Sequence, residues 1–516
     1  MADIWLRKEI SSLVTEAVSN DKGLKRSIGA VGLVALGIGA IIGAGLFTST
    51  AEAIAEHTGP AVSISFLIAG IGCALAGLCY AEFASMIPIA GSAYTYAYAT
   101  LGELIAWIIG WDLVLEYGVA SAKVATSWSE YCCKLLSNVF HLQVPYEFSH
   151  SPFQFSPEGV RGIINLPAVF IILLLSIVLI RGMKGSSVLN GIIVIVKVGI
   201  VLLFIAFGWS YIDPGNFEPY LPVNTGVAGE YGWTGIFAGA SVVFFAFIGF
   251  DAVSTAAQEA KNPQRDMPKG ILLSLLICVV LYILFAHVLA GVANYREFKT
   301  VGQEASVTYV IDTYLKDYQW LSPLVTVAIL AGFSSVILVM LMGQSRVFFS
   351  MAKDGLVPRV FSRLHPRFQT PWKSNLLFFL FVSLIAAFVP ASIISDMTVI
   401  GTLFAFVIVC LSIVVLRKTN PELPRPFRTP WVPLIPILGM IVCCGLIYAL
   451  GPANWLRLII WLVIGIGIYF SYGVKNSRLQ LNQSPRRGVS DIKNDSRKKI
   501  ETDLSVEAND DNNPAK

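Results

Sequence analysis

One lysine of this chain lies where a charge is costly. Lys197 stands in the middle of the apolar run Gly191-Ile-Ile-Val-Ile-Val-Lys-Val-Gly-Ile-Val-Leu-Leu-Phe204. Burial in an apolar medium disfavours the charged form of a lysine, so such a group can exchange a proton near neutral pH if its surroundings alternate. The alternative is a structural lysine that stays paired with a carbonyl or an acid.

An acid occupies a similar position in a second run. Glu116 lies in Trp111-Asp-Leu-Val-Leu-Glu-Tyr117, and an acid in such a run usually faces a cavity or a partner. It either assists proton transfer, contacts a substrate or makes a structural hydrogen bond. We interpret three further ionisable residues of the apolar runs as caps, gate pairs or satisfied polar groups: Glu82, Asp251 and His287.

Two apolar runs contain residues that interrupt helices. The first, Gly37-Ile-Gly-Ala-Ile-Ile-Gly-Ala-Gly-Leu-Phe47, holds four glycines, each of which weakens a helix by about 1 kcal/mol relative to alanine. Small residues also allow close helix packing, which is the alternative interpretation. The second, Phe244-Phe-Ala-Phe-Ile-Gly-Phe-Asp251, follows five runs later at a matching depth. Two such interruptions in corresponding halves are typical of inverted-repeat transporters, whose unwound backbone binds substrate.

The composition requires a membrane as the main solvent. Of the 516 residues, 55% are hydrophobic and 14% are charged, whereas about a quarter of a soluble globular chain is charged. A backbone in lipid satisfies its polar groups in helices of roughly 20 residues, closed barrels apart. We predict an all-α membrane protein with about 12 transmembrane helices. They are expected near residues 28–55, 60–87, 94–130, 163–181, 187–209, 233–258, 269–293, 320–351, 374–389, 395–416, 432–450 and 454–473.

The basic residues set the expected orientation. Cytoplasmic connections are enriched in lysine and arginine, and the basic clusters fall in alternate connections. We expect a multi-pass protein of the cell (inner) membrane with both termini cytoplasmic. The first span is expected to be kept, because no signal peptide precedes it. The clusters are Lys22, Lys25 and Arg26; Arg181 and Lys184; Lys261, Arg265 and Lys269; Lys353, Arg359, Arg363, Arg367 and Lys373; Arg417, Lys418, Arg425 and Arg428; and the region from Lys475.

The polar residues argue against several classes of function. The charges lie between apolar runs and form no basic patch, so nucleic acid is not an expected partner. The eight cysteines contain no Cys-x-x-Cys pair, and no histidine cluster has metal-ligand spacing. We expect no metal, no cofactor and no catalytic constellation, and hence not an enzyme.

An odd repeat of five spans gives two halves of opposite orientation. Spans eleven and twelve then lie outside the repeated core. The C-terminal tail is rich in Asn, Asp, Ser and Lys, a composition that cannot bury enough apolar surface to fold alone. The predicted segments are a cytoplasmic N-terminal segment at 1–26, a first repeat at 27–209, a second repeat at 210–416, two further spans at 417–474 and a disordered cytoplasmic tail at 475–516.

Two helix breaks at the midplane suit a zwitterionic ligand. Free amides at the positive end of a half-helix attract a carboxylate, and freed carbonyls accept from an ammonium group. The predicted substrate site comprises the backbone near Gly43, the amides of Ala44 and Gly45 for the carboxylate, the carbonyls near Ile41, Phe245, Ala246 and Ile248 for the amine, and Phe245, Phe247 and Phe250 as apolar walls or a lid.

The proton-coupling group is expected near the first break. A protonated Lys197 would mimic a bound sodium ion, and Glu116 is the second candidate. The expected neighbours of Lys197 are the carbonyls of Gly39 and Ile42 and the hydroxyls of Ser334 and Ser335.

Several motifs together carry a family resemblance. They are Gly37 to Phe47, Tyr80-Ala-Glu-Phe83, Gly110-Trp-Asp-Leu-Val-Leu-Glu-Tyr117, Phe244 to Thr255, Glu259 to Pro268, and Gly343 to Arg346 through Lys353 to Pro358. From about Leu24 to Tyr472 the chain resembles the amino acid, polyamine and organocation (APC) transporter superfamily, most of all its bacterial members related to the cationic amino acid transporters. The resemblance implies a leucine-transporter-like 5+5 inverted repeat with broken helices 1 and 6, alternating access, and proton coupling through Lys197.

Two positions depart from the pattern of that superfamily. Ala44 stands where relatives often carry Thr or Ser, which removes one expected carboxylate contact. Gln258 replaces an acid that is common at the lower end of span six. Affinity and gating are expected to differ accordingly, whereas the backbone site does not depend on either side chain.

These observations predict an amino acid permease. The favoured mechanism is proton-coupled symport of small neutral or cationic L-amino acids, in which outside protons load Lys197 and leave with the substrate on the cytoplasmic side. The alternatives are an amino acid or amine exchanger and a transporter-like amino acid sensor. The expected partners are the amino acid, the proton and the lipid bilayer. Which amino acid is carried, any accessory subunit and the oligomeric state stay open.

Overall fold

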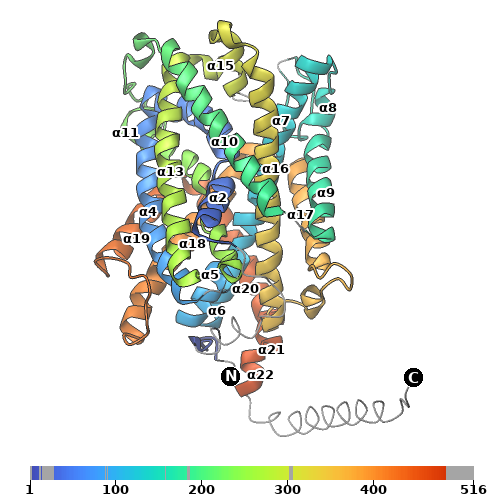
Figure 1. Cartoon of the computed structure of the whole chain (residues 1–516), viewed down its shortest axis with the longest axis vertical. Helices are drawn as coiled ribbons and strands as arrows, with labels where there is room; N and C mark the ends of the chain where they lie inside the picture. The colour runs from blue at the N-terminus through green and yellow to red at the C-terminus, as the bar shows by residue number, and fades with distance from the viewer. Residues whose placement is uncertain are drawn as a thin grey trace, which may run out of the picture.

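The chain folds into a bundle of helices. The computed structural model describes residues 3–10, 13, 28–87, 89, 91–156, 158–182, 186–301 and 306–483, and these residues contain no β-strand. Most helices run along the long axis of the molecule (Figure 1). Eight of those in the described ranges are long and apolar enough to cross a membrane, and four further apolar helices are shorter. The prediction of a multi-pass, all-helical membrane protein is confirmed at this level.

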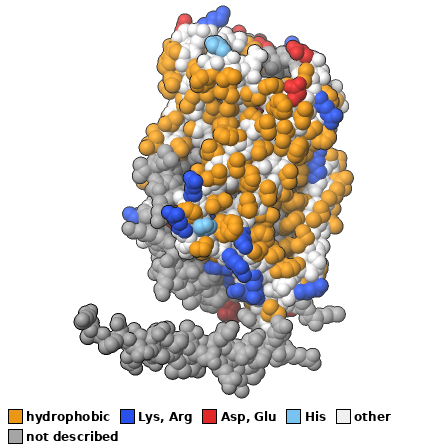
Figure 2. Space-filling view, turned by 90° about the vertical axis from the view of Figure 1, so that its right-hand side faces the viewer, with side chains coloured by type: hydrophobic (Ala, Val, Ile, Leu, Met, Phe, Trp, Pro, Cys, Tyr) orange, Lys and Arg blue, Asp and Glu red, His pale blue; other side chains and the backbone are white. Residues whose placement is uncertain are grey.

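The surface of the bundle is apolar over most of its height. Figure 2 shows one face covered by hydrophobic side chains, with acidic side chains at the upper end and a group of basic side chains near the lower end. Large aliphatic side chains such as Leu276, Ile459 and Val463 are more than half exposed. An apolar surface of this extent is stable against lipid tails and not against water.

The helices agree with most of the predicted spans. Up to residue 208 they are α2 (Ala30–Ile41), α4 (Val62–Met86), α6 (Glu103–Leu113), α7 (Ala120–Phe140), α9 (Leu166–Arg181) and α10 (Ser186–Gly208). They continue with α11 (Gly232–Phe244), α13 (Pro263–Val292), α16 (Leu321–Asp354), α17 (Trp372–Phe388), α18 (Ala391–Thr419), α19 (Leu434–Ala449) and α20 (Pro452–Ile468). Two short helices, α14 (Tyr295–Val301) and α15 (Ser306–Tyr314), lie in the connection before α16.

The third predicted span, 94–130, begins too early. Residues 92–100 form a separate helix, α5 (Ser92–Thr100), and the membrane helix starts only at Glu103. Gly102 divides them, because its φ of 108° is open to glycine but strained for other residues. A side chain there would also meet the backbone of Trp5, whose carbonyl oxygen lies 2.8 Å from the ideal Cβ position. The sequence pattern alone did not separate α5, since its tyrosines and alanines extend the apolar run.

Helix α2 lies at the centre of the bundle. It packs against α13, α10 and α16, and α10 crosses obliquely between α13 and α16 in front of it (Figure 1). The glycine-rich end of α2 is therefore surrounded by protein and kept away from lipid. Such an enclosed position allows a backbone to leave helical geometry at membrane depth.

The two described ends of the chain meet at one end of the bundle. The backbone amide of Asp3 donates to the side-chain oxygen of Gln480 at 3.2 Å, and the Gln480 side-chain amide donates to the Asp3 carbonyl at 2.6 Å. Helices α21 (Val474–Asn476) and α22 (Arg478–Gln483) extend to residue 483, so the predicted unstructured tail, 475–516, starts too early. The rest of that tail, most of the N-terminal segment, and Lys22, Lys25, Arg26 and Lys184 lie outside the described residues.

Glu82 joins α4 to the connection between α18 and α19. Its side chain is fully buried and binds Arg417 through two hydrogen bonds of 2.9 Å each. The side chain of Arg425 lies 3.3 Å away, and the amide of Thr429 donates to the same carboxylate at 2.8 Å. This carboxylate therefore compensates buried positive charge.

We predict that Glu82→Ala destabilises the purified protein. The substitution leaves the buried guanidinium of Arg425 without its anion, which typically costs about 3 kcal/mol or more. The midpoint of thermal unfolding in detergent should fall by several degrees relative to the parent chain. Glu422→Ala, which removes an exposed acid from the same connection, is the matched control. Equal midpoints for the two variants would contradict the assignment.

Candidate functional site

The first expected interruption is present. Helix α2 ends at Ile41, and Ile42 has extended backbone angles of −70° and 103°. Helical geometry resumes at Ala44 and continues as the π-helical turn η1 (Gly45–Ser49). Because Ile42 is extended, the amides of Ala44 and Gly45 begin a new segment and have no carbonyl one helical turn before them. These are the two amides that the sequence predicted for a carboxylate.

The second interruption is present as well. Helix α11 ends at Phe244 and tightens into the 3₁₀ turn η7 (Phe245–Phe247), after which Ile248 is extended with a ψ of 134°. Gly249 has a φ of 111°, and α12 (Ala252–Thr255) begins three residues later. The chain needs glycine at this point, since an ideal Cβ on Gly249 would lie 2.8 Å from the carbonyl oxygen of Ala40.

The two breaks lie against one another. An ideal Cβ on Gly45 would stand 2.2 Å from the Cα of Ala246, so the backbone of the first break packs directly on the backbone of the second. Gly249 of the second break likewise packs on the backbone of Ala40, which lies just before the first break. Glycine therefore serves both purposes considered for it, because it interrupts the helices and lets them approach closely.

A tyrosine that the sequence analysis did not identify lies between the breaks. The hydroxyl of Tyr282 on α13 is 2.9 Å from the carbonyl oxygen of Ile41 and 3.0 Å from that of Ala246. Its ring contacts Phe66 and Phe247. Two of the carbonyls predicted for a substrate amine therefore accept from a protein group in this structure. The available signal was that Tyr282 is the one tyrosine in the apolar helix α13.

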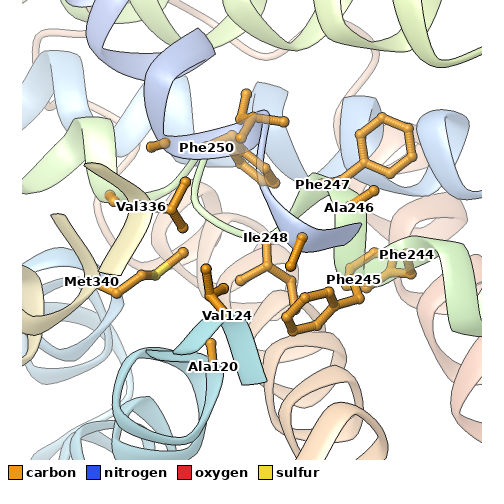
Figure 3. Close-up of a cluster of buried hydrophobic side chains, with 14 of the residues drawn as sticks. Ala120, Val124, Phe244, Phe245, Ala246, Phe247, Ile248, Phe250, Val336 and Met340 are labelled. Carbon is orange, nitrogen blue, oxygen red and sulfur yellow. The ribbon is translucent and has the colours of Figure 1, made fainter. Parts of the chain in front are cut away.

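Apolar side chains surround the second break. Figure 3 shows Ile248 between α7, which contributes Ala120 and Val124, and α16, which contributes Val336 and Met340. The ring of Phe245 lies beside Val124 in the same view, and Phe247 points away from α7 and α16. We call Ala120, Val124, Phe245, Ile248, Val336 and Met340 the apolar wall. All six are 7% exposed or less. Four of them come from unbroken helices and were not predicted.

Lys197 reaches the first break from α10. Its side-chain nitrogen donates to the carbonyl of Gly39 at 2.8 Å and to that of Ile42 at 2.9 Å, and its side chain is 2% exposed. The two carbonyl neighbours are those expected from the sequence. Of the two hydroxyls expected beside Lys197, the Ser334 hydroxyl donates to the backbone carbonyl of Leu330 in its own helix, at 2.8 Å. The stem of Lys197 packs on α16 at Gly332, where an ideal Cβ would lie 2.8 Å from its Cε.

Glu116 lies at the other break. It belongs to the π-helical turn η4 (Val114–Val119), is fully buried and lies near Asp251, and neither of its carboxyl oxygens has a hydrogen-bond partner among the described residues. The hydroxyl of Tyr117 donates to the same aspartate. The two candidates for proton coupling are thus held at different places, with Lys197 on the carbonyls of α2 and Glu116 on the segment that follows Gly249.

Polar contacts join neighbouring segments on both sides of the two breaks. On one side, the hydroxyls of Tyr131 and Ser306 donate to the carbonyl of Phe47 at 3.2 and 3.1 Å, which ties η1 to α7 and α15. On the other side, Arg346 of α16 binds Glu259 at 2.8 Å. The interlocked breaks therefore lie between two layers of contacts that would have to open for a ligand to pass.

We predict that a methyl group at position 45 disables the site. Gly45→Ala forces the two breaks apart, because the Cβ cannot stand 2.2 Å from a Cα. The rate of substrate uptake by reconstituted protein should fall at least about ten-fold, the effect typical of a misplaced binding group. Gly467→Ala on α20, where the added Cβ meets no atom within 4 Å, is the control and should transport normally. Normal uptake by Gly45→Ala would refute the interlock.

Comparison with known proteins places these features in a family. The sequence profile of the family described as amino acid permease matches residues 28–470. The chain is 42% identical over 476 residues to the branched-chain amino acid permease BcaP of Bacillus subtilis (strain 168), covering 92% of this chain and 99% of that relative. It is 40% identical to the methylthioribose transporter of the same organism, over 93% and 100% of the two chains. It is 36% identical to cationic amino acid transporter 4, vacuolar, of Arabidopsis thaliana, over 82% and 68%.

Proposed function

The chain belongs to the amino acid permease family, and from this premise we propose that it is a proton-coupled symporter of small neutral or cationic L-amino acids that works by alternating access. It acts in the cell (inner) membrane, with both termini cytoplasmic. Its core is the 5+5 inverted repeat, in which residues 27–209 and 210–416 are the two halves. The observation that carries the proposal is the pair of interlocked breaks, at Ile42 and Ile248.

The breaks support an amino acid as the substrate. Every amino acid carries a carboxylate and an ammonium group a fixed distance apart. The amides of Ala44 and Gly45 suit the carboxylate, and the carbonyls near Ile41, Phe245, Ala246 and Ile248 suit the ammonium group. These groups belong to the backbone, so they bind the part of the molecule that all amino acids share.

The apolar wall favours the neutral members of the proposed range. An aliphatic side chain of the substrate would meet Ala120, Val124, Val336 and Met340, all of which are apolar and buried. A guanidinium or ammonium side chain would find no acid among the six residues of this wall. The similarity to a branched-chain amino acid permease agrees with a neutral aliphatic substrate, whereas the cationic relatives keep the alternative open.

Lys197 supports coupling to protons. Its two hydrogen bonds go to Gly39 and Ile42, which flank the end of α2. A charged lysine in this position stabilises the carbonyls at the break, and a neutral one binds them more weakly. Loading and unloading the proton would therefore bias the first break between two conformations, which is what coupling requires.

We predict that the purified chain, in liposomes, takes up radiolabelled neutral aliphatic amino acids faster under an inward proton gradient. In a competition panel of all twenty amino acids, leucine, isoleucine, valine and alanine should compete more strongly than arginine and lysine, because burying a charge against the apolar wall is costly. Uptake that occurs only with amino acid loaded inside would favour the exchanger. Binding without any uptake would favour the sensor, and the absence of both would refute the permease.

We predict that Lys197→Ala decouples uptake from pH. In the parent chain, lowering the outside pH should accelerate uptake, because the protonated lysine is the form that holds Gly39 and Ile42. The variant has no proton to load, so its residual uptake should not respond to an imposed pH gradient, while substrate binding stays measurable. Lys418→Ala, at an exposed position at the end of α18, should keep the parent response. An unchanged pH response of Lys197→Ala would return this lysine to a structural role.

A further inference from the structure

The hydroxyl of Tyr282 has one hydrogen to donate and lies within reach of two backbone carbonyls. It lies 2.9 Å from the carbonyl of Ile41 and 3.0 Å from that of Ala246. A tyrosine hydroxyl has a single O–H donor, so it can satisfy only one of the two carbonyls at any moment. The geometry leaves the other carbonyl to be satisfied by another donor or by none.

Both carbonyls are at places where the helices stop. Ile41 is the last residue of α2, and Ala246 lies in the turn that precedes the extended residue Ile248. The residues are 2% and 1% exposed, and Tyr282 is fully buried. A carbonyl without a donor in such surroundings is unfavourable, because it has lost water without gaining a partner.

The position of the hydroxyl is fixed by packing. The ring of Tyr282 contacts Phe66 of α4 with centroids 5.7 Å apart, and Phe247 of the second break with centroids 5.2 Å apart. The ring is thus held between α4 and the second break by contacts that do not involve the hydroxyl. Removing the oxygen alone leaves these contacts in place.

We propose that Tyr282 is the positioning residue that lets the empty transporter reorient. The inference rests on the proposed function and adds to it a residue that the transporter needs in order to reorient with no substrate bound. With an amino acid bound, the substrate ammonium group carries three N–H donors, which are enough for both carbonyls, so the loaded site does not depend on Tyr282. With no substrate bound, Tyr282 holds the only donor among these groups. Its hydroxyl lies within reach of both carbonyls, so its one hydrogen bond can pass from one break to the other while the site passes through its closed state.

The distinction between two transport modes tests the proposal. Net uptake requires the empty transporter to return, whereas counterflow between equal substrate pools requires only the loaded one to move. In Tyr282→Phe the empty state loses its donor and the loaded state keeps the substrate ammonium. The rate of net uptake should therefore fall about ten-fold or more, while the rate of counterflow stays within about two-fold of the parent chain.

Tyr469→Phe is the matched control for losing a buried tyrosine hydroxyl. That hydroxyl donates to Glu103 at 3.0 Å, and its residue is fully buried in η11 (Tyr469–Gly473), which follows α20. Both transport modes should stay near the parent rates in this variant. If net uptake falls in Tyr282→Phe and not in Tyr469→Phe, weaker packing of the helix bundle would not explain the loss.

Three results would overturn the proposal. An equal loss of net uptake and counterflow in Tyr282→Phe would show a merely structural hydroxyl. Unchanged net uptake would show that the empty transporter does not need it. Counterflow without net uptake in the parent chain would show that the empty transporter does not return even with the hydroxyl present. A parent chain that performs neither mode would instead refute the proposed function itself.

Discussion

The structure depends on how peptide groups are satisfied where water is absent. A helix in a membrane meets this demand within itself, and an interrupted helix does not. At Ile42 and at Ile248 the helical hydrogen bonding is interrupted, and the two interrupted segments pack against each other. Gly45 lies directly on Ala246, Gly249 lies on Ala40, and Lys197 and Tyr282 donate to carbonyls at the breaks. The unbroken helices around α2 keep lipid away from this arrangement.

The parts that the sequence predicted are those with a local physical cause. Glycine weakens a helix, and the glycines at 37–45 and at 249 stand in apolar runs at matching depth, so both breaks could be located, although Gly37 and Gly39 themselves lie inside α2. Lys197 was found because its charge contradicts its apolar surroundings. The start of α6 was misplaced, since the tyrosines and alanines of α5 continue the apolar run and the positive φ of Gly102 that separates the two helices is not determined by the sequence pattern. Tyr282, Val124 and Met340 were missed because a side chain's partners across a bundle depend on helix rotation, which the sequence pattern leaves undetermined.

The ionisable groups divide between the two halves of the site. Lys197 acts on the carbonyls of α2, and Glu116 with Tyr117 lies against Asp251, just after the second break. A proton at either place would change the hydrogen bonding of one break without directly touching the other. The contact between Gly45 and Ala246 then offers a mechanical route by which a change at one break reaches its counterpart, because neither backbone can shift without displacing the other.

The origin of the wall residues has a consequence for how such proteins diversify. The groups suited to the invariant part of an amino acid are main-chain atoms of tightly packed segments, where almost any replacement is excluded. The groups that would meet the variable part are side chains of α7 and α16, which are continuous helices and tolerate exchange of one aliphatic residue for another. Selection can therefore alter which amino acid is transported by changing a few positions on a rigid frame, while the recognition of amino acids as a class stays untouched.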